Sequence, residues 1–172
     1  MSEDLDWSYR VTEIPEGGLK TTREATEGER VRLAEALEIM GCRRLTAEFT
    51  IRAIGKGHYR LSGKVAADVT QACVVTLEPI EQRASGDFDV EFWPAGGLPQ
   101  STEDEIEALS AAEIEPIEHG RIDVGQIVFE TLSASIDPYP RKEGAEFDPP
   151  ADEGDGAAAG PFAALRKLRE NR

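Results

Sequence analysis

The fold is decided by the segment CRRLTAEFTIRAIGKGHYRLSGKVAADVTQA, which runs from Cys42 to Ala72. Apolar and polar residues alternate on both sides of the Gly-Lys-Gly sequence at 55–57. A period of two predicts β-strands, and the glycines predict a tight turn between them. The sequence therefore predicts a β-hairpin whose strands run from 42 to 54 and from 59 to 75, with Glu78-Pro79 breaking the second strand.

The two strands share a register that buries one face. Centring the hairpin near Lys56 places Phe49 opposite Gly63 and Ile51 opposite Leu61, so both apolar sets fall on the same side. We expect Phe49 to be buried over Gly63. In this register Cys42 lies nearer Thr70 than Cys73 along the partner strand, so no disulfide is expected between the two cysteines.

Two segments predict helices on the apolar side. Thr26 and Glu29 form a capping box, and a helix with an apolar face of Val31, Ala34, Leu37, Ala36 and Met40 is expected to end at Gly41. A second helix is predicted over 121–136, with Asp123 as its N-cap. Its expected apolar stripe consists of Val124, Ile127, Val128 and Leu132.

The remaining elements follow from alternation and composition. Strands are predicted at 7–14 and 88–93, a loop over 95–101, and a short helix around 104–111. The fold class is therefore α+β, with an antiparallel sheet, either open or half-closed as a barrel, covered by two helices. Residues 1–142 are predicted to form a single α+β domain and 143–160 a mobile acidic Pro/Gly/Ala linker. The end, 161–172, is a short basic amphipathic segment.

The chain is acidic as a whole. Of its 172 residues, 34 are Asp or Glu and 19 are Lys or Arg, for a net charge of −15. This balance argues against a broad DNA-binding surface. No apolar run long enough for a membrane helix is present, and the acidic start MSEDLDWSYR lacks the apolar core of a secretory signal. We expect a cytoplasmic protein that binds neither membrane nor DNA.

The charge is distributed unevenly. The window from Cys42 to Lys64 contains six basic residues and one acidic residue, a net charge of +5. The window 161–172 contains four basic residues and one acidic residue, a net charge of +3. Between 101 and 118 there are seven acids and no Lys or Arg. The hairpin window supplies five candidate binding cations, which point away from the apolar face or flank it: Arg43, Arg44, Arg52, Arg60 and Lys64.

Each basic region has two interpretations. The hairpin cations form either a solubilising outer face or a contact for RNA or the ribosome. The C-terminal stripe of Phe162, Leu165 and Leu168 forms either a helix that packs back on the domain or a hook for a partner.

No catalytic constellation is evident. His58 and His119 are the only histidines, and neither lies among residues spaced as metal ligands, so both are expected at the surface. The sequence contains no nucleophile motif and no Gly-rich phosphate loop, and the acid pairs are typical of a solvated loop. We expect no metal and no cofactor.

Motifs along the chain resemble one family. They are Leu61-Ser62-Gly63-Lys64-Val65, the segment from Gln71 to Ile80 with Cys73, Glu78 and Pro79, then Arg121-Ile122-Asp123-Val124, Asp137-Pro138-Tyr139-Pro140-Arg141, and Pro161-Phe162-Ala163-Ala164-Leu165. In this order they resemble the YceD-like family of large ribosomal RNA subunit accumulation proteins. Many family members carry Cys-x-x-Cys at the Cys73 turn. Here Thr76 stands at the second position, which argues against a metal or redox role for the pair.

The resemblance implies a non-enzymatic role in 23S rRNA accumulation and large-subunit biogenesis. The implied partner is ribosomal RNA or a large-subunit assembly intermediate, and the acidic loop and tail would meet a basic ribosomal protein. Two other classes stay open at this point. One is an RNA-processing enzyme of the nuclease type, which needs carboxylates converging on Mg²⁺. The other is an acidic binding module for a basic protein partner.

Overall fold

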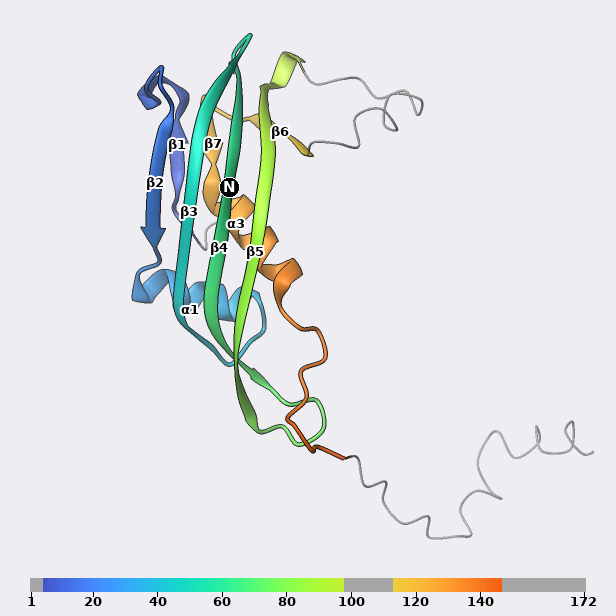
Figure 1. The fold of residues 1–172 in the computed structure, drawn as a ribbon. Helices are drawn as coiled ribbons and strands as arrows, with labels where there is room; N and C mark the ends of the chain where they lie inside the picture. The colour runs from blue at the N-terminus through green and yellow to red at the C-terminus, as the bar shows by residue number, and fades with distance from the viewer. Residues whose placement is uncertain (1–4, 98–112, 147–172) are drawn as a thin grey trace, which may run out of the picture. The chain divides into compact units, whose positions relative to one another are not determined.

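The computed structural model describes residues 5–97 and 113–146 (Figure 1). The chain divides into two units, 1–142 and 143–172, and every element below belongs to the first. Five strands form the main sheet in the order β2-β3-β4-β5-β6, and β1 and β7 form a separate two-stranded antiparallel ribbon. The strands are β1 (Ser8–Arg10), β2 (Leu19–Glu24), β3 (Gly41–Gly55), β4 (His58–Ala72), β5 (Pro79–Pro94), β6 (Glu113–Ile117) and β7 (Arg121–Asp123).

The predicted hairpin is confirmed as β3 and β4. Phe49 pairs with Gly63 and Ile51 with Leu61, in an antiparallel register that shifts only near the two ends of β3. The inward residues Leu45, Ala47, Phe49 and Ile51 are each at most 1% exposed. Cys42 pairs with Val69, and both cysteines are free thiols, as the register predicted.

Strand β5 is longer than the sequence predicted. It runs from Pro79 to Pro94 and pairs with β4 along almost its whole length, so Pro79 begins a strand that was expected to start near Phe88. Gly86 lies in its middle, against the second helix: a Cβ there would lie 2.6 Å from Ser135 Oγ and 2.8 Å from Thr131 Cγ2. The glycine that weakens the strand signal is therefore required by helix packing.

The sheet is mixed, which corrects the prediction of an antiparallel sheet. β2 to β5 are antiparallel neighbours, but β6 pairs parallel to β5, with Phe92 beside Glu115. The sheet is not closed, since β2 and β6 are its two edges, so the half-closed barrel is not confirmed. Neither edge strand was predicted, because β2 is short and mostly polar, and β6 is short, contains a proline and lies in the acidic stretch.

Both predicted helices are present, and both are shorter than expected. α1 (Glu27–Ala36) begins with the predicted capping box of Thr26 and Glu29. It ends five residues before Gly41, at a turn where Glu38 has a φ of 53°. The predicted apolar face is partly wrong: Ala34 and the unpredicted Leu33 are buried, whereas Val31 and Met40 are 52% and 59% exposed.

α3 (Val124–Ser135) agrees closely with the helix that the sequence predicts. The Asp123 side chain accepts a hydrogen bond from Gln126 N at 3.1 Å and caps the helix. All four predicted stripe residues, Val124, Ile127, Val128 and Leu132, are buried. The helix begins three residues late because 121–123 form β7.

The helices and the ribbon cover one face of the sheet. α1 packs on β3, and α3 packs on β4 and β5, behind the sheet in the view of Figure 1. Only Ser8–Arg10 of the predicted strand at 7–14 is extended, and Val11–Glu13 form a 3₁₀ helix. Trp7 and Leu5 are nevertheless buried in the core. No helix in the described ranges is long and apolar enough to cross a membrane. Among the described elements, none covers the opposite, outer face of the sheet.

Candidate functional site

The outer face of the sheet carries charges of both signs. Alternation along the paired strands places six cations and seven acids on it. They are Lys20, Arg44, Arg52, Arg60, Lys64 and Arg83, and Glu24, Glu48, Asp68, Glu81, Asp87, Asp89 and Glu91. The net charge of +5 in the hairpin window is therefore balanced by acidic side chains of the neighbouring strands β2 and β5.

Four of the five predicted cations form an ion pair. Arg43 pairs with Glu81 at 3.2 Å, Arg44 with Glu24 at 3.3 Å, Lys64 with Glu48 at 3.6 Å and Arg60 with Asp89 at 2.6 Å. Their four side chains are 50–68% exposed, and pairs between exposed side chains contribute little to stability. Opening one of these pairs would therefore cost little stability, except for Arg60, which both carboxylate oxygens of Asp89 hold.

Arg52 is the exception among the predicted cations. Within the described parts of the chain it forms no ion pair, and it lies directly opposite Arg60 across the hairpin. Like charges directly opposite each other on a sheet are destabilising. Asp89 and Glu91 offset the charge of Arg60, so Arg52 is the cation that remains without a carboxylate partner at this point of the outer face.

A shallow depression of about 490 Å³ lies between these two arginines. Besides Arg52 and Arg60 it is lined by Thr50, Ile54, Ser62 and Asp89. Asp89 accepts two hydrogen bonds from Arg60, at 2.7 Å from Nε and 2.6 Å from Nη2, and this contact lowers the pKa of Asp89. The lining thus combines two guanidinium groups and two hydroxyl groups, which are hydrogen-bond donors for an anion.

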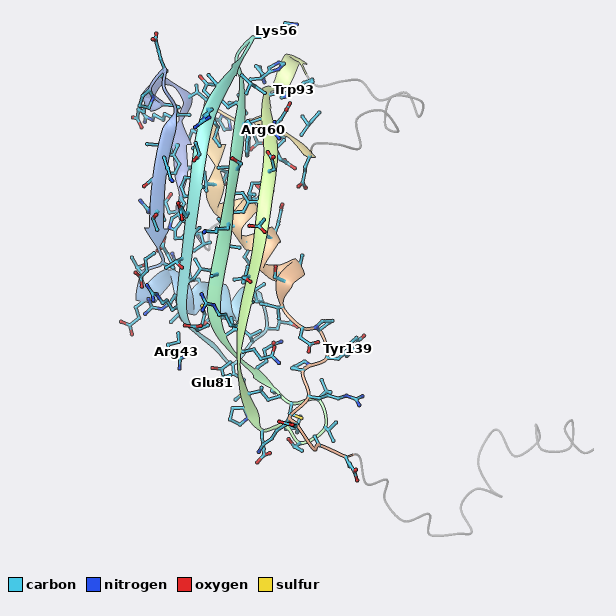
Figure 2. The ribbon with its side chains drawn as sticks, in the orientation of Figure 1. Arg43, Lys56, Arg60, Glu81, Trp93 and Tyr139 are labelled. Atoms are coloured by element: carbon cyan, nitrogen blue, oxygen red, sulfur yellow. The ribbon has the colours of Figure 1, made fainter. Side chains whose placement is uncertain are left out.

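The predicted cations do not converge on one site. Arg44 and Arg52 are eight residues apart on β3, which is about 27 Å along a strand. Figure 2 shows Arg43 and Glu81 near one end of the sheet, and Arg60, Lys56 and Trp93 near the other.

Sequence reasoning missed an aromatic pair at the Arg60 end. The rings of His58 and Trp93 stack with centroids 4.4 Å apart and an angle of 10° between their planes. The Trp93 Nε1 donates a hydrogen bond to Glu91 at 3.0 Å. Alternation places His58 on the outer face, but only the register between β4 and β5 brings Trp93 beside it.

The motif residues Cys73, Glu78 and Pro79 lie at the turn between β4 and β5. Cys73 Sγ accepts hydrogen bonds from Thr76 N and Lys142 N, both at 3.4 Å. Hydrogen bonding from the Thr76 side chain, and from the backbone N–H groups of Lys142 and Thr76, lowers the pKa of Cys73 to about 6. Thr76, at the position of a second cysteine, thus donates to the sulfur of the first.

The segment after α3 is hydrogen-bonded to this turn. Val74 N donates to Pro140 O at 2.9 Å, and Lys142 Nζ contacts Glu78 at 2.8 Å. The groups facing Cys73 Sγ are therefore hydrogen-bond donors and not metal ligands. In the described ranges, no three or more His, Cys, Asp and Glu side chains group as metal ligands would.

A second depression, of about 270 Å³, lies beside β6. Its lining includes Glu115, Glu118, His119, Arg121 and Asp123. Burial, together with Glu130, Glu113 and Glu118 nearby, raises the pKa of Glu115. The site therefore concentrates negative charge on the side of the sheet that faces α3.

Some predictions lie outside the described residues. They are the stripe of Phe162, Leu165 and Leu168, the helix around 104–111, and nearly all of the linker at 143–160 with its expected mobility. These stay predictions.

Comparison with known proteins agrees with the resemblance. No curated protein and no solved structure matches the chain. A family model, described as large ribosomal RNA subunit accumulation protein YceD, matches residues 61–169, which is more than half of the chain. The match includes β4 from Leu61 onward, the Cys73 turn, β5 and α3. The chain therefore belongs to the YceD family of large ribosomal RNA subunit accumulation proteins.

Proposed function

We propose that this protein is a non-catalytic factor for 23S rRNA accumulation, and that it binds ribosomal RNA or a large-subunit assembly intermediate through the outer face of its sheet. The family description supports the role in accumulation. The site is supported by one observation: the described helices and the β1–β7 ribbon lie on the other face, so the exposed cations of β3 and β4 face outward.

The balanced charge of the face determines how it binds. Each phosphate must compete with a carboxylate already beside the cation, so affinity per contact is modest. Binding releases counterions from RNA, so affinity falls as salt rises, with a slope that reports the number of phosphate contacts. Such a surface favours an RNA–protein intermediate, in which a few contacts to RNA are combined with others.

The test uses cells that lack the gene, complemented with a triple variant, Arg52→Gln, Arg60→Gln and Lys64→Gln. Glutamine is preferred to glutamate because Arg60→Glu would place a carboxylate beside Asp89 and strain the sheet. We expect less co-sedimentation with large-subunit precursors and less 23S rRNA. The matched control, Arg10→Gln, Arg32→Gln and Arg141→Gln, changes the net charge equally at exposed positions on other elements.

Normal sedimentation and normal rRNA with the triple variant would show that the outer face only solubilises the protein. The segment containing Phe162, Leu165 and Leu168 would then be the next candidate. If purified protein cleaves precursor rRNA, the non-catalytic part of the proposal is wrong and an RNA-processing enzyme is favoured.

A second function is favoured by the depression at Glu115. Its acidic lining suits a Lys or Arg side chain of a basic protein, since a cation there would offset both the burial and the neighbouring carboxylates that raise the pKa of Glu115. Pulldown with and without ribonuclease distinguishes the two. A partner that is retained after ribonuclease and lost with Glu115→Gln and Glu118→Gln would be a protein bound in this depression.

A further inference from the structure

We infer that the turn end of the outer face binds one unpaired nucleotide of RNA, with its phosphate between Arg52 and Arg60 and its base against the stacked rings of His58 and Trp93. These four residues, together with Lys56 at the turn, are called the tip site. The inference rests on the proposed function and names the ligand chemistry of the same face.

The phosphate position follows from the two opposed arginines. Asp89 binds Arg60 through Nε and Nη2, which holds its guanidinium in one orientation. Arg52, opposite, has no carboxylate partner in the described ranges. A phosphate in the depression between them would offset the repulsion and accept hydrogen bonds from both, with the hydroxyls of Thr50 and Ser62 within the same lining.

The base position follows from the aromatic pair. His58 lies two residues before Arg60 on β4, about 7 Å along the strand, so the ring pair is one row nearer the turn than the arginines. Glu91 holds the Trp93 indole through Nε1, and both rings are partly exposed. An oriented aromatic pair offers a stacking surface with little ordering cost, and stacking of a base on an aromatic ring is worth about 1–3 kcal/mol.

Lys56 adds a cation on the turn side of the rings, whereas the two arginines lie on the other side. It lies in the turn with a φ of 55°, between two glycines that also have positive φ values. Figure 2 shows Lys56, Trp93 and Arg60 following one another along this end of the sheet. Cations on both sides of a stacking surface match the alternation of phosphate, base and phosphate along a single strand. An acidic peptide would satisfy the arginines without using the rings.

The chain provides its own optical probe. It has two tryptophans, and Trp7 is buried at 1% exposure, so quenching by an added base reports on Trp93. The full chain is titrated with a single-stranded uridylate 12-mer, a duplex RNA of the same length, and inorganic polyphosphate. We expect the single strand to quench the emission, and the duplex and polyphosphate to leave it nearly unchanged.

Variants assign the contributions. Trp93→Leu is expected to weaken binding of the 12-mer about tenfold, and Trp93→Phe, which keeps a ring, to restore part of it. Arg52→Gln is expected to make the slope of log affinity against log salt shallower by about 0.7, the value for one phosphate contact on a single strand. Arg141→Gln, which removes an exposed cation in the segment after α3, outside the outer face, is the control and is expected to change neither. Thermal unfolding establishes that each variant is folded.

Failure of this inference differs from failure of the proposed function. An unquenched wild-type protein, or unchanged affinity in Trp93→Leu, overturns the tip site. If polyglutamate displaces the 12-mer and is itself bound more tightly, the site is one for acidic protein. In complemented cells, normal 23S rRNA with Trp93→Leu but not with the triple glutamine variant rejects the tip site alone. Normal 23S rRNA in cells lacking the gene rejects the proposed function.

Discussion

Phe49 lies over Gly63 across the β3–β4 pair, and the two backbones come closer there than a side chain would allow. A Cβ placed on Gly63 would lie 2.6 Å from Phe49 Cβ and 2.8 Å from Phe49 Cα. Phe49 is 1% exposed, so it has no free space into which to move. The glycine is therefore a packing requirement of the hairpin, at a strand position where glycine is otherwise unfavourable.

Gly63→Ala is expected to destabilise the protein by about 2 kcal/mol, because the atoms that meet the new methyl group belong to the main chain of β3 as well as to Phe49. Urea unfolding should show a lower midpoint with an unchanged slope. Gly41→Ala, at the start of the partner strand β3, is the control, since nothing lies within 4 Å of a Cβ at that position. Equal stability of the two variants would show that β3 can shift to accommodate the methyl group without loss of stability.

Glu29→Ala is expected to cost about 3 kcal/mol. Glu29 accepts from Thr26 N at 2.8 Å within the capping box, and from the buried Trp7 Nε1 at 2.9 Å, so truncation removes a cap and leaves a buried donor without a partner. Glu27→Ala, a first-turn acid with an exposed side chain, is the matched control. Chemical denaturation of both variants measures the difference, and a loss equal to that of Glu27→Ala would contradict the role of Glu29.

The same carboxylate predicts a pH dependence. Burial raises the pKa of Glu29, but hydrogen bonds from Thr26 and Trp7, together with Arg23, outweigh it and lower the pKa below 4.5. Its stabilising effect is therefore complete above the unfolded pKa and is lost as pH falls through the folded pKa. The stability advantage of wild type over Glu29→Gln should shrink between pH 6 and pH 3. An advantage that does not change with pH would contradict this.

Cys73 predicts a second pH dependence of stability, at higher pH than that of Glu29. Its folded pKa of about 6 lies below the ordinary 9.0, because the Thr76 side chain and two backbone N–H groups donate to the sulfur. Stabilisation is therefore complete above pH 9 and is lost as pH falls through 6. Relative to Cys73→Ala, wild type should gain stability between pH 6 and 9 under reducing conditions. Cys42, whose pKa is raised chiefly by burial, is the control, and Cys42→Ala should show no such gain.

Gln71 provides a test of the contact between β4 and the segment after α3. Its Nε2 donates to Asp137 O at 2.9 Å, while its Oε1 is buried without a partner in the described parts of the chain. Gln71→Leu removes the unpaired oxygen, and water can replace the lost donor at the exposed Asp137, so the variant is expected to be nearly neutral. Gln71→Glu places a carboxylate against a carbonyl and is expected to destabilise by about 3 kcal/mol at pH 7, with recovery as pH falls. Equal stability of the two variants would contradict the contact.

The parts of the fold that the sequence predicted correctly have strong local signals. The alternation through Phe49 and Leu61, the capping box at Thr26 and the stripe of α3 each lie within one segment and each is confirmed. β2 and β6 were missed because their short sequences carry too weak an alternation to predict strands before they pair with β3 and β5. β5 was underestimated because Gly86 is placed by a helix about 45 residues later in the chain.

The candidate site shows the same limit. The five cations were found from the sequence, but their partners were not, since Arg60 meets Asp89 and Arg43 meets Glu81 only through strand pairing. A window of charge along the chain therefore overestimates the charge of the surface. The stack of His58 on Trp93 likewise depends on a register between strands that no single segment contains.

The pairing of Ser8 with Asp123 joins the beginning of the domain to its last strand. During synthesis, the β3–β4 and β4–β5 hairpins can form as soon as their strands have left the ribosome, because the paired strands follow one another in the chain. The N-terminal strand, made first, has no partner strand until more than a hundred further residues have been translated. Completion of the core is thus timed by translation of β7 and α3, and until then the oldest part of the nascent chain stays accessible to chaperones and proteases.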